Sequence, residues 1–121
     1  MKGSLAEIVA SLSHLPGVMA AMVVGAADGL IIETSAMKGA SVSGTDSRKH
    51  TAALGAYLYS KIARASDTAR LGTPAFMRLE AERGQLCVVG AGDVVLVTIV
   101  ASDANLGRVR LDMMKASQDK S

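Results

Sequence analysis

The densest run of apolar positions lies near the C-terminal end of the chain, where residues 86–101 read LCVVGAGDVVLVTIVA. The run is rich in Val and Ile, whose branched side chains favour strands over helices. Residues 90–93 interrupt it with Gly-Ala-Gly-Asp, a sequence that favours a tight turn. We therefore predict strands at 85–90 and 94–101. Their nearly continuous hydrophobicity indicates a sheet that helices cover on both faces.

A second hairpin is predicted earlier in the chain. Residues 18–27 and 30–34 have the Val- and Ile-rich composition of strands. They flank Asp28-Gly29, which is the strongest hairpin signal in the sequence. The two segments are therefore expected to pair as antiparallel strands.

The remaining strand, at residues 76–82, has a different pattern because apolar and polar side chains alternate along it. Charged residues such as Arg78 and Glu80 occupy one side, and charge is a common means of protecting an edge strand against stray pairing. We therefore place this segment at an edge of the sheet. If two such edges met antiparallel, Arg78 and Glu80 could pair across a two-fold axis.

Apolar spacing predicts three helices, at residues 4–14, 49–69 and 104–116. Ser4 with Glu7 forms a capping-box pattern at the start of the first helix. Asp103 is the expected N-cap of the last helix. Residues 117–121 are expected to form a polar tail, and residues 35–48 a loop without periodicity.

The long helix carries two stripes of non-polar residues. We expect the larger side chains to face the core, namely Leu54, Leu58, Ile62 and Ala65. Small residues and one tyrosine form the second stripe, which we interpret as a contact face for another protein: Ala52, Gly55, Ala56, Tyr59 and Ala63. The alternative, that the small residues fit the helix within its own fold, stays open.

Together these segments give one domain over residues 1–121 in the order α-β-β-α-β-β-β-α. The expected fold class is α/β of the α+β type. A single five-stranded antiparallel sheet would be sandwiched between the long helix and the two terminal helices. Because the long helix connects the second and third strands, those two strands are expected at opposite edges.

Composition and charge argue against a nucleic-acid-binding protein and against a membrane-spanning one. The chain has 121 residues, a net charge of +2 with interspersed signs, and 2% aromatic residues, which is unlike a nucleic-acid-binding surface. No apolar run approaches the roughly 20 residues of a membrane span. The single cysteine fits a reducing compartment, so we expect a cytoplasmic protein without membrane insertion.

Residues able to carry chemistry are few and scattered. We interpret Cys87 as a buried inert thiol, His14 as a helix-terminal residue, and His50 as a surface residue. No pattern predicts a metal or cofactor site, so we expect neither, and no enzyme activity. Four arginines are candidate donors to a GTPase transition state, and none stands out: Arg64, Arg70, Arg78 and Arg108.

Three stretches, in this order and spacing, resemble the Roadblock / dynein light chain family: VVGAADGLIIET, CVVGAGDVVLVTIVA and SDANLGRVRLDM. The resemblance covers residues 5–114, and the bacterial members include a mutual gliding motility protein that acts on a Ras-like GTPase. It implies a homodimer in which the third strands pair and the long helices pack side by side. The implied dimer strand consists of Phe76, Met77, Arg78, Leu79, Glu80, Ala81 and Glu82.

The function that follows from this resemblance is a homodimeric regulatory module that binds a Ras-like small GTPase and modulates its nucleotide cycle. Two alternatives stay open. One is a nucleotide-independent dimeric scaffold for signalling or motility complexes. The other is a ligand sensor that uses a pocket between the sheet and residues 35–48.

Overall fold

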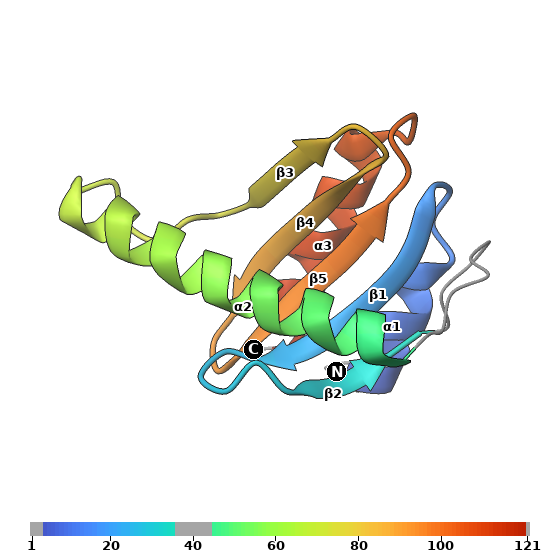
Figure 1. Cartoon of the computed structure of the whole chain (residues 1–121), viewed down its shortest axis with the longest axis horizontal. Coiled ribbons are helices and arrows are strands. Elements are labelled where there is room, and N and C mark those ends of the chain that lie inside the picture. The colour runs from blue at the N-terminus through green and yellow to red at the C-terminus, as the bar shows by residue number, and fades with distance from the viewer. Residues whose placement is uncertain (1–3, 36–44, 121) are drawn as a thin grey trace.

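The computed structural model describes residues 4–35 and 45–120 and contains a single five-stranded sheet (Figure 1). The elements follow in the predicted order: α1 (Leu5–Ser13), β1 (Val18–Gly25), β2 (Ile31–Thr34), α2 (Thr45–Thr68), β3 (Met77–Ala81), β4 (Gly84–Ala91), β5 (Val94–Val100) and α3 (Leu106–Lys120). The strands lie in the order β2-β1-β5-β4-β3, and every neighbouring pair is antiparallel. The predicted fold class is confirmed, and β2 and β3 form opposite edges.

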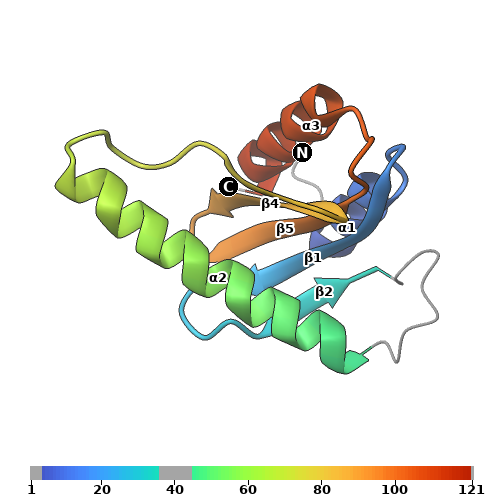
Figure 2. The same cartoon turned by 45° about the horizontal axis from the view of Figure 1, so that its top comes forward.

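The three helices form two layers on opposite faces of the sheet, as predicted. Helix α2 crosses one face, whereas α1 and α3 cover the other (Figure 2). The face under α2 is filled mainly by Val, Met and Ala side chains, and the opposite face by Val, Leu and Ile together with Met113. The central strands β1, β4 and β5 are therefore buried on both sides, which explains why their sequences are nearly continuously apolar.

Local signals explain the first helix. The Ser4 hydroxyl accepts a hydrogen bond from the Glu7 backbone N–H at 3.1 Å, and the Glu7 carboxylate accepts one from the Ser4 N–H at 3.0 Å. The predicted capping box is therefore confirmed. The same bonds lower the pKa of the Glu7 carboxyl group. At the other end the exposed His14 is the C-cap residue, as expected from its position.

Two helix boundaries differ from the prediction. Helix α2 begins at Thr45, four residues before the predicted start, and the rest of the predicted loop, residues 36–44, lies outside the described residues. Helix α3 begins at Leu106 and is capped by Asn105, whose Oδ1 accepts the Arg108 N–H at 3.3 Å, so the assignment of Asp103 was wrong.

The last helix also continues further than expected. It reaches Lys120 and includes residues 117–120, which were predicted to be a polar tail. That segment contains neither Gly nor Pro, so nothing in it stops a helix that packing has already started. Among the described residues, no helix combines the length and hydrophobicity needed to cross a bilayer.

Candidate functional site

The small-residue stripe of α2 faces the sheet of its own chain. Ala52 and Ala56 are 0% and 4% exposed and belong to the core between α2 and the sheet. Gly55 is also buried, while Tyr59 and Ala63 are half-buried. Ala52, Gly55 and Ala56 are therefore covered within the chain and cannot form the predicted contact face for a second copy or a GTPase, whereas Tyr59 and Ala63 remain partly exposed.

Close approach of α2 to the sheet explains why the stripe is small. A Cβ atom added at Gly55 would lie 3.2 Å from the Val97 side chain of β5. One turn later the Tyr59 phenol lies over Gly90 of β4, where any added Cβ would collide with it. This partial burial raises the pKa of the Tyr59 hydroxyl group. The glycine in the helix is thus explained by packing against the sheet.

The larger stripe of α2 points away from the sheet, so its assignment to the core was also wrong. Leu54 is 52% exposed, Ile62 is 45% exposed, Ala65 is exposed and Leu58 is half-buried. The spacing of apolar residues shows which residues share one side of a helix. It does not show which side packs against the sheet when the helix carries two apolar stripes. Here the Val-rich sheet accepts the smaller side chains, so the larger ones lie outside.

Strand β3 lies beside this exposed stripe and forms a free edge of the sheet. Met77 packs into the core beneath α2, and the alternation of a strand places Leu79 and Ala81 on that same side. Leu79 is 51% exposed. Phe76 and Glu82 flank the strand; the half-buried Phe76 ring has the Arg110 guanidinium 5.5 Å from its centre.

Arg78 and Glu80 form an ion pair with each other, at 3.0 Å and largely exposed to solvent. An exposed pair of this kind contributes little to stability. Both side chains lie on the α3 side of β3, opposite to Leu79. The two charges are therefore held at the edge of the sheet, where a second strand could approach them.

Between α2 and the β3–β4 hairpin lies an open, mainly apolar groove of about 350 Å³, which we call the edge groove. It exists because α2 packs over β1, β2, β4 and β5 rather than across the edge strand β3. Figures 1 and 2 also show α2 extending past the end of the sheet. The groove is lined by Thr51, Leu54, Leu58, Leu79, Ala81, Arg83, Gly84, Gln85, Leu86 and Ile99.

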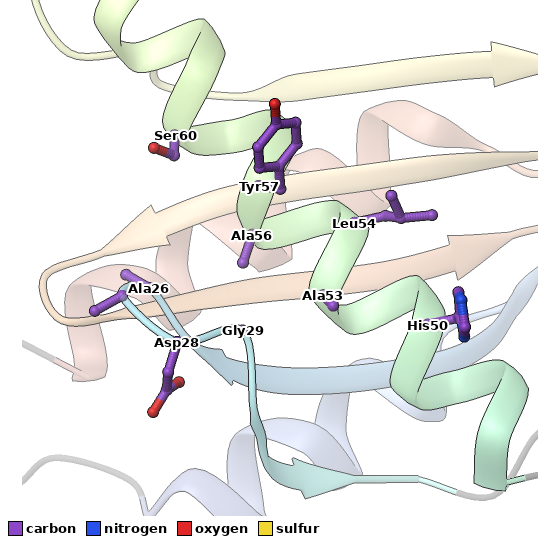
Figure 3. Close-up of a pocket in the computed structure, with 10 residues that line it drawn as sticks. Ala26, Asp28, Gly29, His50, Ala53, Leu54, Ala56, Tyr57 and Ser60 are labelled. Carbon is purple, nitrogen blue, oxygen red and sulfur yellow. The ribbon is translucent and has the colours of Figure 1, made fainter.

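A second hollow, the turn pocket, lies on the other flank of α2 against the β1–β2 turn (Figure 3). Its volume is about 480 Å³. Small residues form its floor, and Tyr57, His50 and Ser60 of α2 stand around it. No pattern in the sequence marked this pocket, because its two walls are more than 20 residues apart.

The titratable residues that the structure describes do not form a reactive centre. Cys87 is fully buried in β4, and burial raises the pKa of its thiol, as expected for an inert cysteine. His50 is exposed on α2, as predicted for a surface residue. Within residues 4–35 and 45–120, no cluster of His, Cys, Asp and Glu could hold a metal ion.

Comparison with known proteins agrees with this geometry. The family pattern of the Roadblock/LC7 domain matches residues 5–101. The uncharacterized protein MJ1340 of Methanocaldococcus jannaschii is 26% identical over 112 residues, covering 93% of this chain and 92% of that protein.

Two solved structures share the fold. A Roadblock/LC7 domain from Streptomyces avermitilis has a TM-score of 0.80 at 22% identity and covers 96% of this chain and 93% of its own. The gliding protein MglB from Thermus thermophilus has a TM-score of 0.80 at 19% identity, covering 99% and 90%. The fold, the element order and the match over residues 5–101 show that this chain belongs to the Roadblock/LC7 domain family.

Proposed function

We propose that the chain is a homodimeric regulatory module that binds a Ras-like small GTPase and modulates its nucleotide cycle. The observation that carries the proposal is the unpaired edge strand β3 beside the exposed apolar stripe of α2. A free strand edge and a contiguous apolar patch are both features that soluble proteins normally cover. A second copy of the chain would cover both at once.

Pairing of two β3 strands fits the residues at the edge. Leu79 is the central residue of Met77–Ala81, so an antiparallel pair centred on it sets Leu79 against its symmetry mate. The same register sets Arg78 opposite Glu80 of the second copy, which gives opposite charges at both ends of the pair. The proposed interface strand is the predicted one, from Phe76 to Glu82.

The exposed stripe of α2 would complete this interface. In a two-fold dimer the edge grooves of both copies merge, and Leu54, Leu58 and Ile62 from each copy gain apolar neighbours. These residues replace the small-residue stripe as the proposed helix contact. The part of α2 that extends past the sheet would then lie against the second copy rather than in solvent.

Family membership and similarity to a gliding-motility protein support a GTPase as the partner. We propose that the module acts by contact and not as an enzyme. Of the four candidate arginine donors, Arg78 is paired with Glu80 and Arg108 with Asp112, each at 3.0 Å. Holding the switch loops of the GTPase in an ordered state requires no donated side chain. A cytoplasmic location is part of the same proposal.

The test is binding of the purified chain to the Ras-like GTPase encoded nearest to it, loaded either with GDP or with a non-hydrolysable GTP analogue. The proposal predicts stronger binding to one nucleotide state and a changed rate of hydrolysis or exchange. Equal binding to both states, with unchanged rates, would favour the nucleotide-independent scaffold. Absence of binding in both states would contradict the GTPase assignment.

A further inference from the structure

The turn pocket is separate from the proposed dimer interface. Its walls are the β1–β2 turn and the flank of α2 that faces away from β3 (Figure 3). The turn pocket and the edge groove share one lining residue, Leu54, which lies on the side of α2 that faces away from the sheet. A second copy seated on the edge groove would therefore leave most of the turn pocket open. The pocket is lined by Ala26, Ala27, Asp28, Gly29, His50, Ala53, Leu54, Ala56, Tyr57 and Ser60.

The floor of the pocket is made of alanine and glycine and leaves room for an incoming side chain. Ala56 belongs to the core, while Ala53 is exposed at the wall. Tyr57 stands at the rim and is 58% exposed. An exposed aromatic ring beside a concave apolar surface is a frequent feature of protein contact sites, because it adds large contact area with little loss of conformational entropy.

Cationic residues lie on α2 beside this pocket without lining it. Lys49, Lys61 and Arg64 are exposed on the helix, and Asp67 is the single acidic residue between Lys49 and Thr68. Lys61 lies over the Tyr57 ring, with its Nζ atom 5.4 Å from the ring centre. Within the described part of the chain, none of these three cations has an ion-pair partner.

Asp28, the acidic residue that lines the pocket, does not neutralise this charge. Asp28 extends away from α2 (Figure 3), and its Oδ1 accepts the Leu30 backbone N–H at 3.0 Å within its own turn. The cations of α2 are thus available to an acidic partner.

We infer that this flank of α2 binds a protein segment that inserts one apolar side chain into the turn pocket and places carboxylates against Lys61 and Arg64. The inference rests on the proposed function in one respect, namely that the GTPase is the first partner to test. It extends that function by stating which surface and which chemistry recognise the partner. A partner with positive charge at this position would be repelled by Lys61 and Arg64, so the same cations that bind an acidic partner also provide specificity.

A protein surface fits these features better than a lipid bilayer does. Helices that bind a membrane surface present protruding apolar side chains, which they insert into the headgroup region. Here the apolar surface beside the cations is concave and is floored by small residues, so it can receive a side chain but has little to insert. Negatively charged vesicles are nevertheless included in the test, as the competing outcome.

The experiment compares the unmodified chain with three variants. Lys61→Glu/Arg64→Glu reverses the charge of the flank, and Ala53→Phe fills the pocket from an exposed helix position. Arg108→Glu/Lys115→Glu is the control, because it makes the same change in net charge on α3, which covers the opposite face of the sheet. Sedimentation verifies that all four proteins keep the same oligomeric state.

The first readout is the Kd for the GTPase in its better-bound nucleotide state at low salt. The charge reversal and the filled pocket should each weaken binding by more than about tenfold, and the control by less than about twofold. Added salt should weaken binding by the unmodified chain more than binding by the reversed variant. If the GTPase binds the reversed variant as well as the unmodified chain, the inference is wrong while the proposed function stands.

The second readout does not depend on the GTPase. Backbone amide signals of Ala53 and Tyr57 are followed by NMR during titration with a Glu-Glu-Leu-Glu-Glu peptide and, separately, with its lysine counterpart. The inference predicts shifts with the acidic peptide alone, even if the GTPase proves not to be the partner. No response to the acidic peptide, or a response only to phosphatidylserine vesicles, would overturn it.

Discussion

The phenol of Tyr59 on α2 lies across the backbone of Gly90 on β4, and a Cβ atom at residue 90 would collide with it. This contact and the close packing of Gly55 of α2 against Val97 of β5 together determine how closely the long helix approaches the sheet. It also turns the larger apolar residues of α2 outward, so the packing within the chain creates the exposed stripe that we assign to the dimer.

Gly90→Ala should lower the free energy of unfolding by about 1–3 kcal/mol, because overpacking at this contact forces the helix or the ring to move. Urea denaturation monitored by circular dichroism measures the change. In a double-mutant cycle with Tyr59→Ala, the alanine at residue 90 should cost much less, since the ring that it meets is gone. Equal costs in both backgrounds would show that the contact does not position the helix.

Burial of Tyr59 also gives the fold a dependence on alkaline pH. The folded state raises the pKa of this hydroxyl group above its usual value. The associated stability is therefore present below the unfolded pKa of about 10 and is lost as pH rises through the folded value. Tyr59→Phe should flatten the fall in unfolding free energy above pH 10.

The turn that follows helix α2 contains a residue with an unfavourable backbone conformation. Arg70 has φ of 62°, and the following Leu71 N–H bonds to the Ser66 carbonyl oxygen at 2.8 Å, which is the pattern that glycine usually completes. Arg70→Gly should therefore stabilise the chain by about 0.5–1 kcal/mol. Ala65→Gly, at an exposed position inside the same helix, should destabilise it by about 1 kcal/mol. Destabilisation by Arg70→Gly would contradict this explanation of the helix end.

The charges of β3 allow a test of the proposed strand register. Arg78→Glu sets two acidic residues opposite each other across the interface, so dimer dissociation should increase severalfold at low salt. The exchange Arg78→Glu/Glu80→Arg restores opposite charges and should recover most of the loss. The Kd of the dimer, measured by analytical ultracentrifugation, reports both effects. Failure of the exchange to recover dimerisation would exclude a register centred on Leu79.

Much of this fold follows from the sequence because the central strands give unambiguous signals. The run from Leu86 to Ala101, divided at Gly92, has one plausible arrangement, and the alternating charges of β3 indicate an edge. The capping box of Ser4 is equally local. Each of these features depends on neighbouring residues or on simple periodicity.

The surface of α2 could not be predicted in the same way. Which stripe faces the sheet depends on the distance between helix and strands, and that distance depends on Gly90, which is 31 positions from Tyr59 in the sequence. Size alone favoured Leu54 as a core residue, whereas the sheet accepts Ala52 and Ala56. The cap at Asn105 was missed for a related reason, because Asp103 has equally good capping chemistry two residues earlier.

The central claim is that a second copy joins at β3, and Leu79→Arg tests it most directly. Sedimentation equilibrium should give a dimer for the unmodified chain and a folded monomer for Leu79→Arg, because the arginine would be buried without a partner between two copies. Leu111→Arg is the matched control, since Leu111 is 59% exposed on α3, away from the edge groove. A dimer that survives Leu79→Arg, or an unmodified chain that is monomeric at high concentration, would contradict the claim.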